Sequence, residues 1–192
     1  MATTALIPAP KLTYEAYMAE PEVQGRYDIV NGVRVFQPEV SWKRQRIIGN
    51  LAEAISGYGR VSGNHGVISP FDVLIRRNPL QIRQPDMLLV SHNRLVQGGG
   101  PPKIGPLEIG PELVVEIVLG NETKQISQEK IADYRAIKVD ECWVVRPDDR
   151  TVEVLTLTPG GARSMATYGE GQAVVSVVFP GLAVPVAEVF AA

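Results

Sequence analysis

The chain has 192 residues and a formal net charge of −2, from 19 basic and 21 acidic residues. This length suits one domain with a sizeable core, and the near-neutral charge excludes a chain-wide electrostatic attraction to nucleic acid. A nucleic-acid partner would therefore need a local basic patch. The single cysteine, Cys142, excludes an intramolecular disulfide and cysteine-rich zinc sites, and its strand-like surroundings predict a buried structural thiol.

The hydropathy of the chain indicates a protein without membrane segments. No apolar run approaches the roughly 18 residues of a membrane-spanning helix, and the N-terminus lacks the basic region and apolar stretch of a signal peptide. We therefore expect a cytoplasmic protein. Residues 1–11, rich in Ala, Thr and Pro, are expected to be a loose lead-in, and residues 12–192 to form a single domain.

The N-terminal part of the chain predicts a short helix followed by a β-hairpin. Thr13 can cap a helix that Pro21 ends. Asn31-Gly32 then supplies the two positive φ values that a tight turn needs between strands at 26–30 and 33–37.

A long helix is expected to begin at Ser41 and to end at Gly57 and Gly59. Its apolar face consists of Ile47, Ile48, Leu51, Ala54, Ile55 and Tyr58. Its first turns carry three cations, Lys43, Arg44 and Arg46. These cations predict either a solvated face or a patch that contacts the phosphate groups of a nucleic acid.

The middle of the chain predicts short strands at residues 61–68, 71–76 and 87–90, the last preceded by Gln84, Pro85 and Asp86. Residues 92–111 are dense in Gly and Pro, and a loop of this length is typical of mobile or functional segments. The two histidines, His65 and His92, are expected to be loop residues and not ligands.

A strand at residues 113–118 places Glu116 between apolar neighbours, and a helix that begins between Asn121 and Ser127 follows it. The apolar stripe of that helix consists of Ile126, Lys130, Tyr134 and Ile137 and thus contains a lysine. The rest of the chain predicts strands at 141–145 and 151–157, one or two more strands after Pro159, and a hydrophobic tail at 182–190 that docks on the body.

Asp86, Glu116 and Lys130 would share one site if the two strands that carry the carboxylates are neighbours in a sheet. A carboxylate deep in a strand is costly unless it is paired or holds a metal. Two carboxylates suit Mg²⁺ or Mn²⁺, which would activate a water and offset charge on a scissile phosphate, while the lysine assists the nucleophile or the developing oxyanion. Structural roles stay open as alternatives, since Asp86 can cap a turn and Lys130 can extend towards solvent.

A family resemblance is carried by short blocks at residues 12–17, 26–32, 46–51, 84–90, 113–118, 129–134 and 141–145. In this order the blocks resemble the PD-(D/E)XK nuclease superfamily and, more closely, its Uma-two family of predicted restriction endonucleases. The resemblance implies a mixed α/β (α+β) fold of the restriction-endonuclease type. Its central mixed sheet would be flanked by helices, with an N-terminal hairpin and extra C-terminal strands.

The resemblance also implies the site. Asp86 and Glu116 would be the ligands of Mg²⁺ or Mn²⁺, and Lys130 would replace the superfamily's strand lysine, whose usual position is Val118 here. Asp28, at the position of a glutamate in the family's hairpin, is a candidate accessory residue. The implied substrate is DNA, and because nucleases that cut both strands often work as dimers, we expect a homodimer.

Several positions depart from the family pattern. Leu119-Gly120-Asn121 replaces a Ser-Pro-Ser/Thr turn, Ile126 replaces an aspartate, Val33 a glutamate and Arg44 a histidine. Our leading hypothesis is a metal-dependent DNA endonuclease. The departures favour an alternative, a catalytically degenerate nuclease fold that binds nucleic acid or a protein without cutting. A third hypothesis is an interaction module that uses the loop at 92–111 and has no nucleic-acid role.

Overall fold

The computed structural model describes residues 11–37, 41–62, 65–68, 70–120 and 124–192, without the side chains of residues 65–68 and 124–126. Most of the expected lead-in and the side chain of Ile126 therefore lie outside the described part. Within that part, no helix is both long enough and apolar enough to cross a membrane.

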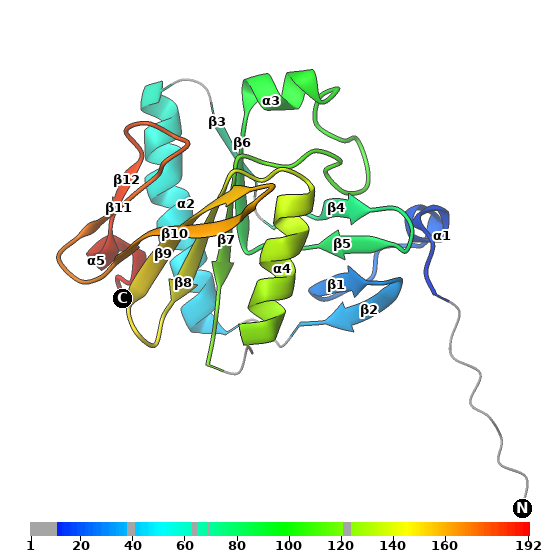
Figure 1. Cartoon of the computed structure of the whole chain (residues 1–192), viewed down its shortest axis with the longest axis horizontal. Helices are drawn as coiled ribbons and strands as arrows, with labels where there is room; N and C mark the ends of the chain where they lie inside the picture. Colours follow the sequence, from blue (N-terminus) through cyan, green and yellow to red (C-terminus); the bar gives the residue numbers. More distant parts are fainter. Residues whose placement is uncertain (1–10, 38–40, 63–64, 69, 121–123) are drawn as a thin grey trace, which may run out of the picture.

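The elements follow one another as a mixture of helices and strands (Figure 1). In chain order they are α1 (Tyr14–Ala19), β1 (Tyr27–Val30), β2 (Val33–Phe36), α2 (Trp42–Ser62), β3 (His65–Ile68), β4 (Val73–Arg76), β5 (Gln81–Arg83), β6 (Met87–Ser91), α3 (His92–Gln97), β7 (Leu113–Ile117), α4 (Lys124–Ala136), β8 (Glu141–Arg146), β9 (Thr151–Thr158), β10 (Gly161–Tyr168), β11 (Ala173–Val175), β12 (Ala183–Pro185) and α5 (Val186–Val189).

The central sheet has six strands in the order β10-β9-β8-β7-β6-β3. It is mixed, because β7 and β8 run parallel while the other neighbours are antiparallel. Figure 1 shows α2 and α4 on opposite sides of this sheet. The predicted fold class, a central mixed sheet flanked by helices, is confirmed.

Alternation along the central strands divides the core into two layers. In β7, Leu113, Val115 and Ile117 face α2 and the C-terminal tail, whereas Val114 belongs to the opposite layer with Tyr134 of α4. Glu116, two residues after Val114, therefore points towards α4. The tail docks as predicted through a buried set that includes Leu182, Val184, Val186 and Val189.

The predicted N-terminal hairpin is confirmed and belongs to a second sheet, in the order β2-β1-β5-β4. Asn31 and Gly32 have φ values of 52° and 78°, as a tight turn between β1 and β2 requires. The sequence does not predict β5, because Gln81 and Arg83 are polar residues that signal an exposed segment. Both are buried, and the structure satisfies them with hydrogen bonds to the carboxylate of Asp133.

The long helix α2 continues through Gly57 and Gly59, where the sequence predicts its end, so the next strand begins at His65 and not at residue 61. Each glycine inside a helix costs about 1 kcal/mol relative to alanine. Burial of the apolar face of α2 in the core offsets this cost through Ile47, Leu51 and Ile55.

Residues 92–111 are not the open loop that their Gly and Pro content predicts. They begin with α3, whose N-terminus is capped by the Ser91 hydroxyl accepting a hydrogen bond from the Arg94 backbone N–H at 3.1 Å. Leu107 is buried and pairs with Val73 of β4. The expectation that both histidines lie in loops is also wrong, since His65 begins β3 and His92 begins α3.

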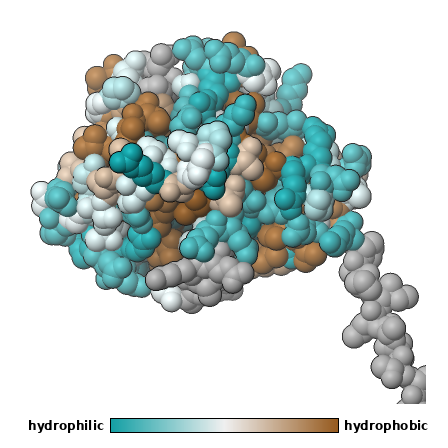
Figure 2. Space-filling view, viewed as in Figure 1, coloured by the Kyte–Doolittle hydropathy of each residue, from teal (hydrophilic) through white to brown (hydrophobic). Residues whose placement is uncertain are grey.

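The buried interior and the polar exterior agree with the composition. Cys142 is fully buried in β8, as predicted, and burial raises the pKa of its thiol. On the face drawn in Figure 2, hydrophilic residues cover α3 and surround β4 and β5, with apolar residues scattered among them.

Candidate active site

The two predicted carboxylates meet because their strands are neighbours. Met87 of β6 pairs with Val115 of β7 in an antiparallel register, so Asp86, the residue before β6, falls opposite Glu116. The Ile117 backbone N–H donates a hydrogen bond of 2.6 Å to Asp86 Oδ2. Both carboxylates are buried, with relative exposures of 0% for Asp86 and 5% for Glu116.

Glu116 is held by two groups on α4. Lys130 Nζ lies 2.8 Å from Glu116 Oε2, and the Tyr134 hydroxyl donates a hydrogen bond to Oε1. Residues four apart share a helix face, which explains why both reach the same carboxylate. Lys130 is only 5% exposed, so its side chain does not extend towards solvent.

Burial controls the electrostatics of this pair. It raises the pKa of the Glu116 carboxyl group, the Lys130 ammonium acts in the opposite direction and the charge of Asp86 adds to the rise. Burial, together with the Glu116 charge, also raises the pKa of the Tyr134 hydroxyl. Tyr134 therefore stays a proton donor to Glu116.

Two arginines bind Asp86 from different elements. Arg44 Nη1, from the first turn of α2, lies 2.8 Å from Asp86 Oδ1 and 3.0 Å from Oδ2. Arg26, just before β1, donates from Nη1 to Oδ1 and from Nη2 to the backbone carbonyl of Gln84 at 2.8 Å. Burial lowers the pKa of Arg26, but the charges of Asp86 and Glu116 outweigh it, which indicates that this guanidinium lies near both carboxylates.

A second buried network supports the site. Arg83 of β5 contacts Asp28 of β1 at 3.0 Å and Asp133 of α4 at 2.7 Å. Asp28 also accepts a hydrogen bond of 3.0 Å from the Gln84 backbone N–H. The network connects the hairpin to Gln84, two residues before Asp86, and to α4 at a point one turn from Lys130. The structure thus places the candidate accessory Asp28 beside the site, where its contacts are to Arg83 and Gln84.

The three cations in the first turns of α2 do not form one patch. Arg44 points to Asp86, whereas Lys43 pairs with Asp148 at 2.8 Å and the Arg46 guanidinium lies 5.4 Å from the centre of the Trp42 ring. Trp42 is 77% exposed. Lys43, Arg46 and Trp42 line a hollow of about 300 Å³ together with Arg150 and Phe190.

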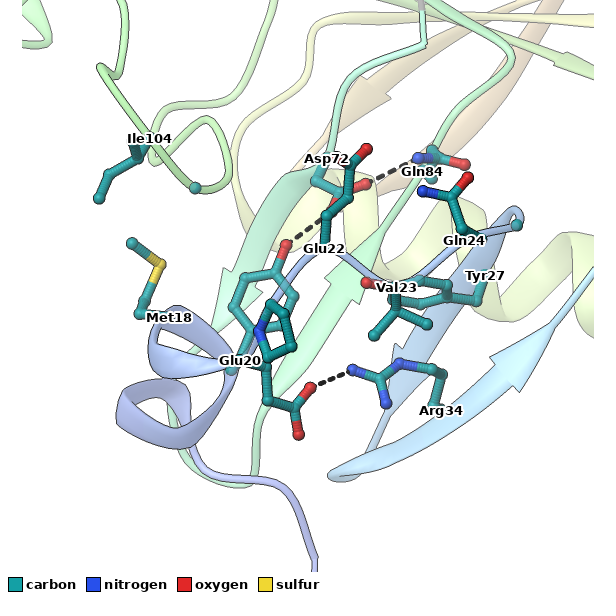
Figure 3. A pocket seen from close by; sticks show the side chains of 14 residues that line it. Met18, Glu20, Glu22, Val23, Gln24, Tyr27, Arg34, Asp72, Gln84 and Ile104 are labelled. Carbon is teal, nitrogen blue, oxygen red and sulfur yellow. Dashed lines mark hydrogen bonds and ion pairs between the residues drawn. The ribbon is translucent and has the colours of Figure 1, made fainter.

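A larger hollow of about 620 Å³ lies between α1, the hairpin and the segment at Ile104 (Figure 3). On its wall, Asp72 accepts hydrogen bonds from the Tyr17 hydroxyl at 2.7 Å and from Gln84 Nε2 at 3.0 Å (Figure 3). Its lining does not include Asp86, Glu116 or Lys130. The hollow does reach Gln84, which lies two residues before Asp86. The hydrogen bonds that Tyr17 and Gln84 donate to Asp72 therefore support the segment before Asp86.

The side chains of the candidate site include ligands that suit a divalent metal ion. Carboxylate oxygens from Asp86 and Glu116 are the ligands that Mg²⁺ and Mn²⁺ prefer, so the chemistry fits. Within the described residues no cluster combines three or more His, Cys, Asp or Glu side chains, so such an ion would keep several waters, as Mg²⁺ commonly does. It would also have to compete with the guanidinium groups of Arg26 and Arg44 for the oxygen atoms of Asp86.

The sequence predicts that the two carboxylates and Lys130 meet, which the structure shows, but it does not predict Arg26 and Tyr134 as their partners. The sequence could have indicated the role of Tyr134, since this residue lies one turn from Lys130 in the same stripe of α4. Arg26 stands in the family block at residues 26–32, but no local pattern links it to Asp86, which lies 60 positions away.

A mixed sheet covered by helices on both faces, with one carboxylate on β7 and another just before the neighbouring β6, is typical of the restriction-endonuclease-like class. The chain belongs to the Uma2 family, described as putative restriction endonuclease, whose model matches residues 14–187. The family predicted from the sequence blocks is thereby confirmed.

A solved structure agrees with this assignment. The chain is similar to the crystal structure of a putative nuclease belonging to DUF820 from Anabaena variabilis ATCC 29413, with a TM-score of 0.75 and 16% sequence identity over 93% of this chain and 97% of that chain. At this identity the likeness shows a shared fold. No curated protein matches the sequence. The family and the structural neighbour support a nuclease as the class of protein.

Proposed function

We propose that the protein is a metal-dependent nuclease that hydrolyses phosphodiester bonds in DNA at the site formed by Asp86, Glu116 and Lys130. The observation that carries the proposal is the buried Glu116–Lys130 ion pair of 2.8 Å beside a second buried carboxylate. Buried ions are expensive and are retained where they are paired or functional.

The residues of the chain have distinct roles in this proposal. Asp86 and Glu116 would hold Mg²⁺ or Mn²⁺, which when bound supplies an activated water and offsets phosphate charge. Lys130 places its ammonium at the buried carboxylate, where it can donate to the nucleophile or to the developing oxyanion. Tyr134 fixes the orientation of the Glu116 carboxylate, and the Ile117 backbone N–H fixes that of the Asp86 carboxylate.

A cleavage assay tests the proposal. Purified protein is incubated with plasmid DNA and Mg²⁺ or Mn²⁺, and the rate is compared with that of Glu116→Gln and with that of Glu53→Gln, an exposed carboxylate on α2. We expect Glu116→Gln to lose at least about a hundredfold in rate, as for removal of a group that acts in the reaction, and Glu53→Gln to cut normally. Cleavage that survives Glu116→Gln contradicts the site assignment.

A second candidate function is nucleic-acid binding without cleavage. The pairing of Asp86 with two arginines favours it, because those guanidinium groups compete with a metal for the same oxygens. Binding of a labelled duplex across a range of salt concentrations, with and without Mn²⁺, distinguishes the two. Salt-sensitive binding without any metal uptake or cleavage favours the second candidate. A lack of affinity for DNA and RNA even at low salt contradicts both and favours a protein-interaction role.

A further inference from the structure

Asp86 has no free acceptor position for a metal ion. An ionised carboxylate offers about four lone-pair directions. Oδ1 accepts from Arg26 and Arg44, and Oδ2 accepts from Arg44 and from the Ile117 backbone N–H. A metal ion that binds Asp86 must therefore displace one of these donors.

Of the three donors, Arg44 is the one that can leave. The Ile117 N–H belongs to a fully buried strand, and Arg26 is held a second time by the Gln84 carbonyl at 2.8 Å. The Arg44 side chain extends from the first turn of α2, and both of its hydrogen bonds among the described residues go to Asp86. Rotation of this one side chain frees positions on both carboxylate oxygens.

Arg26 shows that the site has unused capacity for an anion. Its Nε atom is buried and has no hydrogen-bond partner among the described residues. Buried donors without a protein partner are rare, and a water, an ion or a bound ligand commonly satisfies them. An oxygen atom of a phosphate group would satisfy this donor, and guanidinium groups match phosphate through parallel hydrogen bonds.

We propose that Arg44 exchanges the carboxylate of Asp86 for a phosphate group of the nucleic acid, next to Arg26, so that nucleic acid and divalent metal bind the site cooperatively. This inference rests on the proposed function and adds an order of binding, in which nucleic acid makes Asp86 available to the metal. Without nucleic acid, Arg44 is the counter-ion of Asp86 and keeps metal affinity low. With nucleic acid, the released carboxylate becomes available to the metal, and by linkage the metal strengthens nucleic-acid binding by the same factor.

Titration calorimetry with Mn²⁺ tests the coupling on the full chain. The Kd for Mn²⁺ is measured with and without a short DNA duplex that carries hydrolysis-resistant phosphorothioate linkages. We expect the duplex to lower the Kd of the parent about tenfold, within the usual range of coupling between two sites. Arg44→Ala should bind Mn²⁺ about tenfold more tightly than the parent without DNA and should lose most of the response to the duplex.

Two further variants serve as controls. Arg60→Ala removes an exposed arginine from the other end of α2 and should behave like the parent. Arg44→Gln keeps a hydrogen-bond donor without the charge and replaces Arg44→Ala if the latter fails to show a cooperative melting transition. Its Mn²⁺ affinity should also exceed that of the parent.

The outcomes separate this inference from the proposed function. Equal Mn²⁺ affinities for the parent and the Arg44 variants, unaffected by the duplex, overturn the inference even if Glu116-dependent cleavage is intact. A lack of Mn²⁺ binding in every protein, with and without the duplex, overturns both.

Discussion

At the scale of single residues, the site consists of buried charges whose partners come from other elements. Lys130 and Glu116 are the clearest case, each about 5% exposed and joined at 2.8 Å. Loss of one partner leaves the other charge buried and uncompensated. The loss of stability on replacing one member should therefore depend on whether the other member is still present.

We predict that Lys130→Met lowers the free energy of unfolding by about 3 kcal/mol, the usual penalty for breaking a buried ion pair. The double variant Glu116→Gln with Lys130→Met should lose less than the sum of the two single variants. Urea unfolding of the four proteins measures this coupling. Strictly additive losses would show that the two side chains do not stabilise one another.

Asp72, on the wall of the hollow in Figure 3, predicts a pH dependence of stability. Burial raises the pKa of its carboxyl group, and hydrogen bonds from Tyr17 and Gln84 reverse this only in part. A carboxyl group whose pKa is raised on folding contributes stability at pH values below its unfolded-state pKa. This contribution is lost as the pH rises through the folded-state pKa.

The parent should therefore lose stability relative to Asp72→Asn as the pH rises from about 4 towards neutrality. Urea unfolding at a series of pH values measures the difference, with Asp149→Asn, an exposed carboxylate, as the control. A difference between Asp72→Asn and the parent that does not change with pH contradicts the raised pKa.

At the scale of elements, the first turns of α2 connect the candidate site with a surface. Arg44 points inward to Asp86, while Trp42, Lys43 and Arg46 line the neighbouring hollow of about 300 Å³. An exposed aromatic ring among cations is typical of a surface on which an unpaired base stacks. Nucleic acid bound at the site could thus extend over this turn.

We predict that Trp42→Ala weakens binding of single-stranded DNA about tenfold, consistent with the usual worth of one stacked base. Fluorescence anisotropy with a labelled oligonucleotide measures the change. Val61→Ala, which removes another exposed apolar side chain from the far end of α2, should leave the affinity unchanged. Equal affinities for Trp42→Ala and the parent would remove this turn from the binding surface.

Elements with a strong local pattern could be predicted from the sequence, and elements determined by tertiary contacts could not. The hairpin around Asn31 and the strand around Glu116 carry turn and hydropathy signals that need no partner. In contrast, β5 consists of polar residues that become buried only because Asp133 of α4 meets them. The end of α2 was missed for a related reason, since packing of its apolar face overrides the glycines.

The same distinction applies to the site. Carboxylates in apolar strands are conspicuous, and the lysine in an apolar helix stripe points to them. The sequence context of Arg44 indicates a cation of a helix and that of Arg26 a block of family resemblance, but neither context points to Asp86. Only the fold shows that Arg26 and Arg44 converge on one carboxylate, and this convergence is what raises the question of how a metal gains access.

At the scale of the whole molecule, the proposed cleavage of duplex DNA predicts a homodimer. Two antiparallel strands present two phosphodiester bonds related by a twofold axis, and a symmetric pair of subunits places one site at each. Light scattering coupled to size-exclusion chromatography should give twice the mass of the 192-residue chain. A monomer that makes double-strand breaks at the same concentration would contradict the dimer.

In the proposed function, Glu116 is part of a metal site that works on nucleic acid. The most direct test is the melting temperature of the parent and of Glu116→Ala on addition of Mn²⁺, in the presence of the hydrolysis-resistant duplex. A ligand that binds the folded state raises the melting temperature. We predict that Mn²⁺ raises it for the parent and leaves it unchanged for Glu116→Ala. Equal shifts in the two proteins would contradict the metal site.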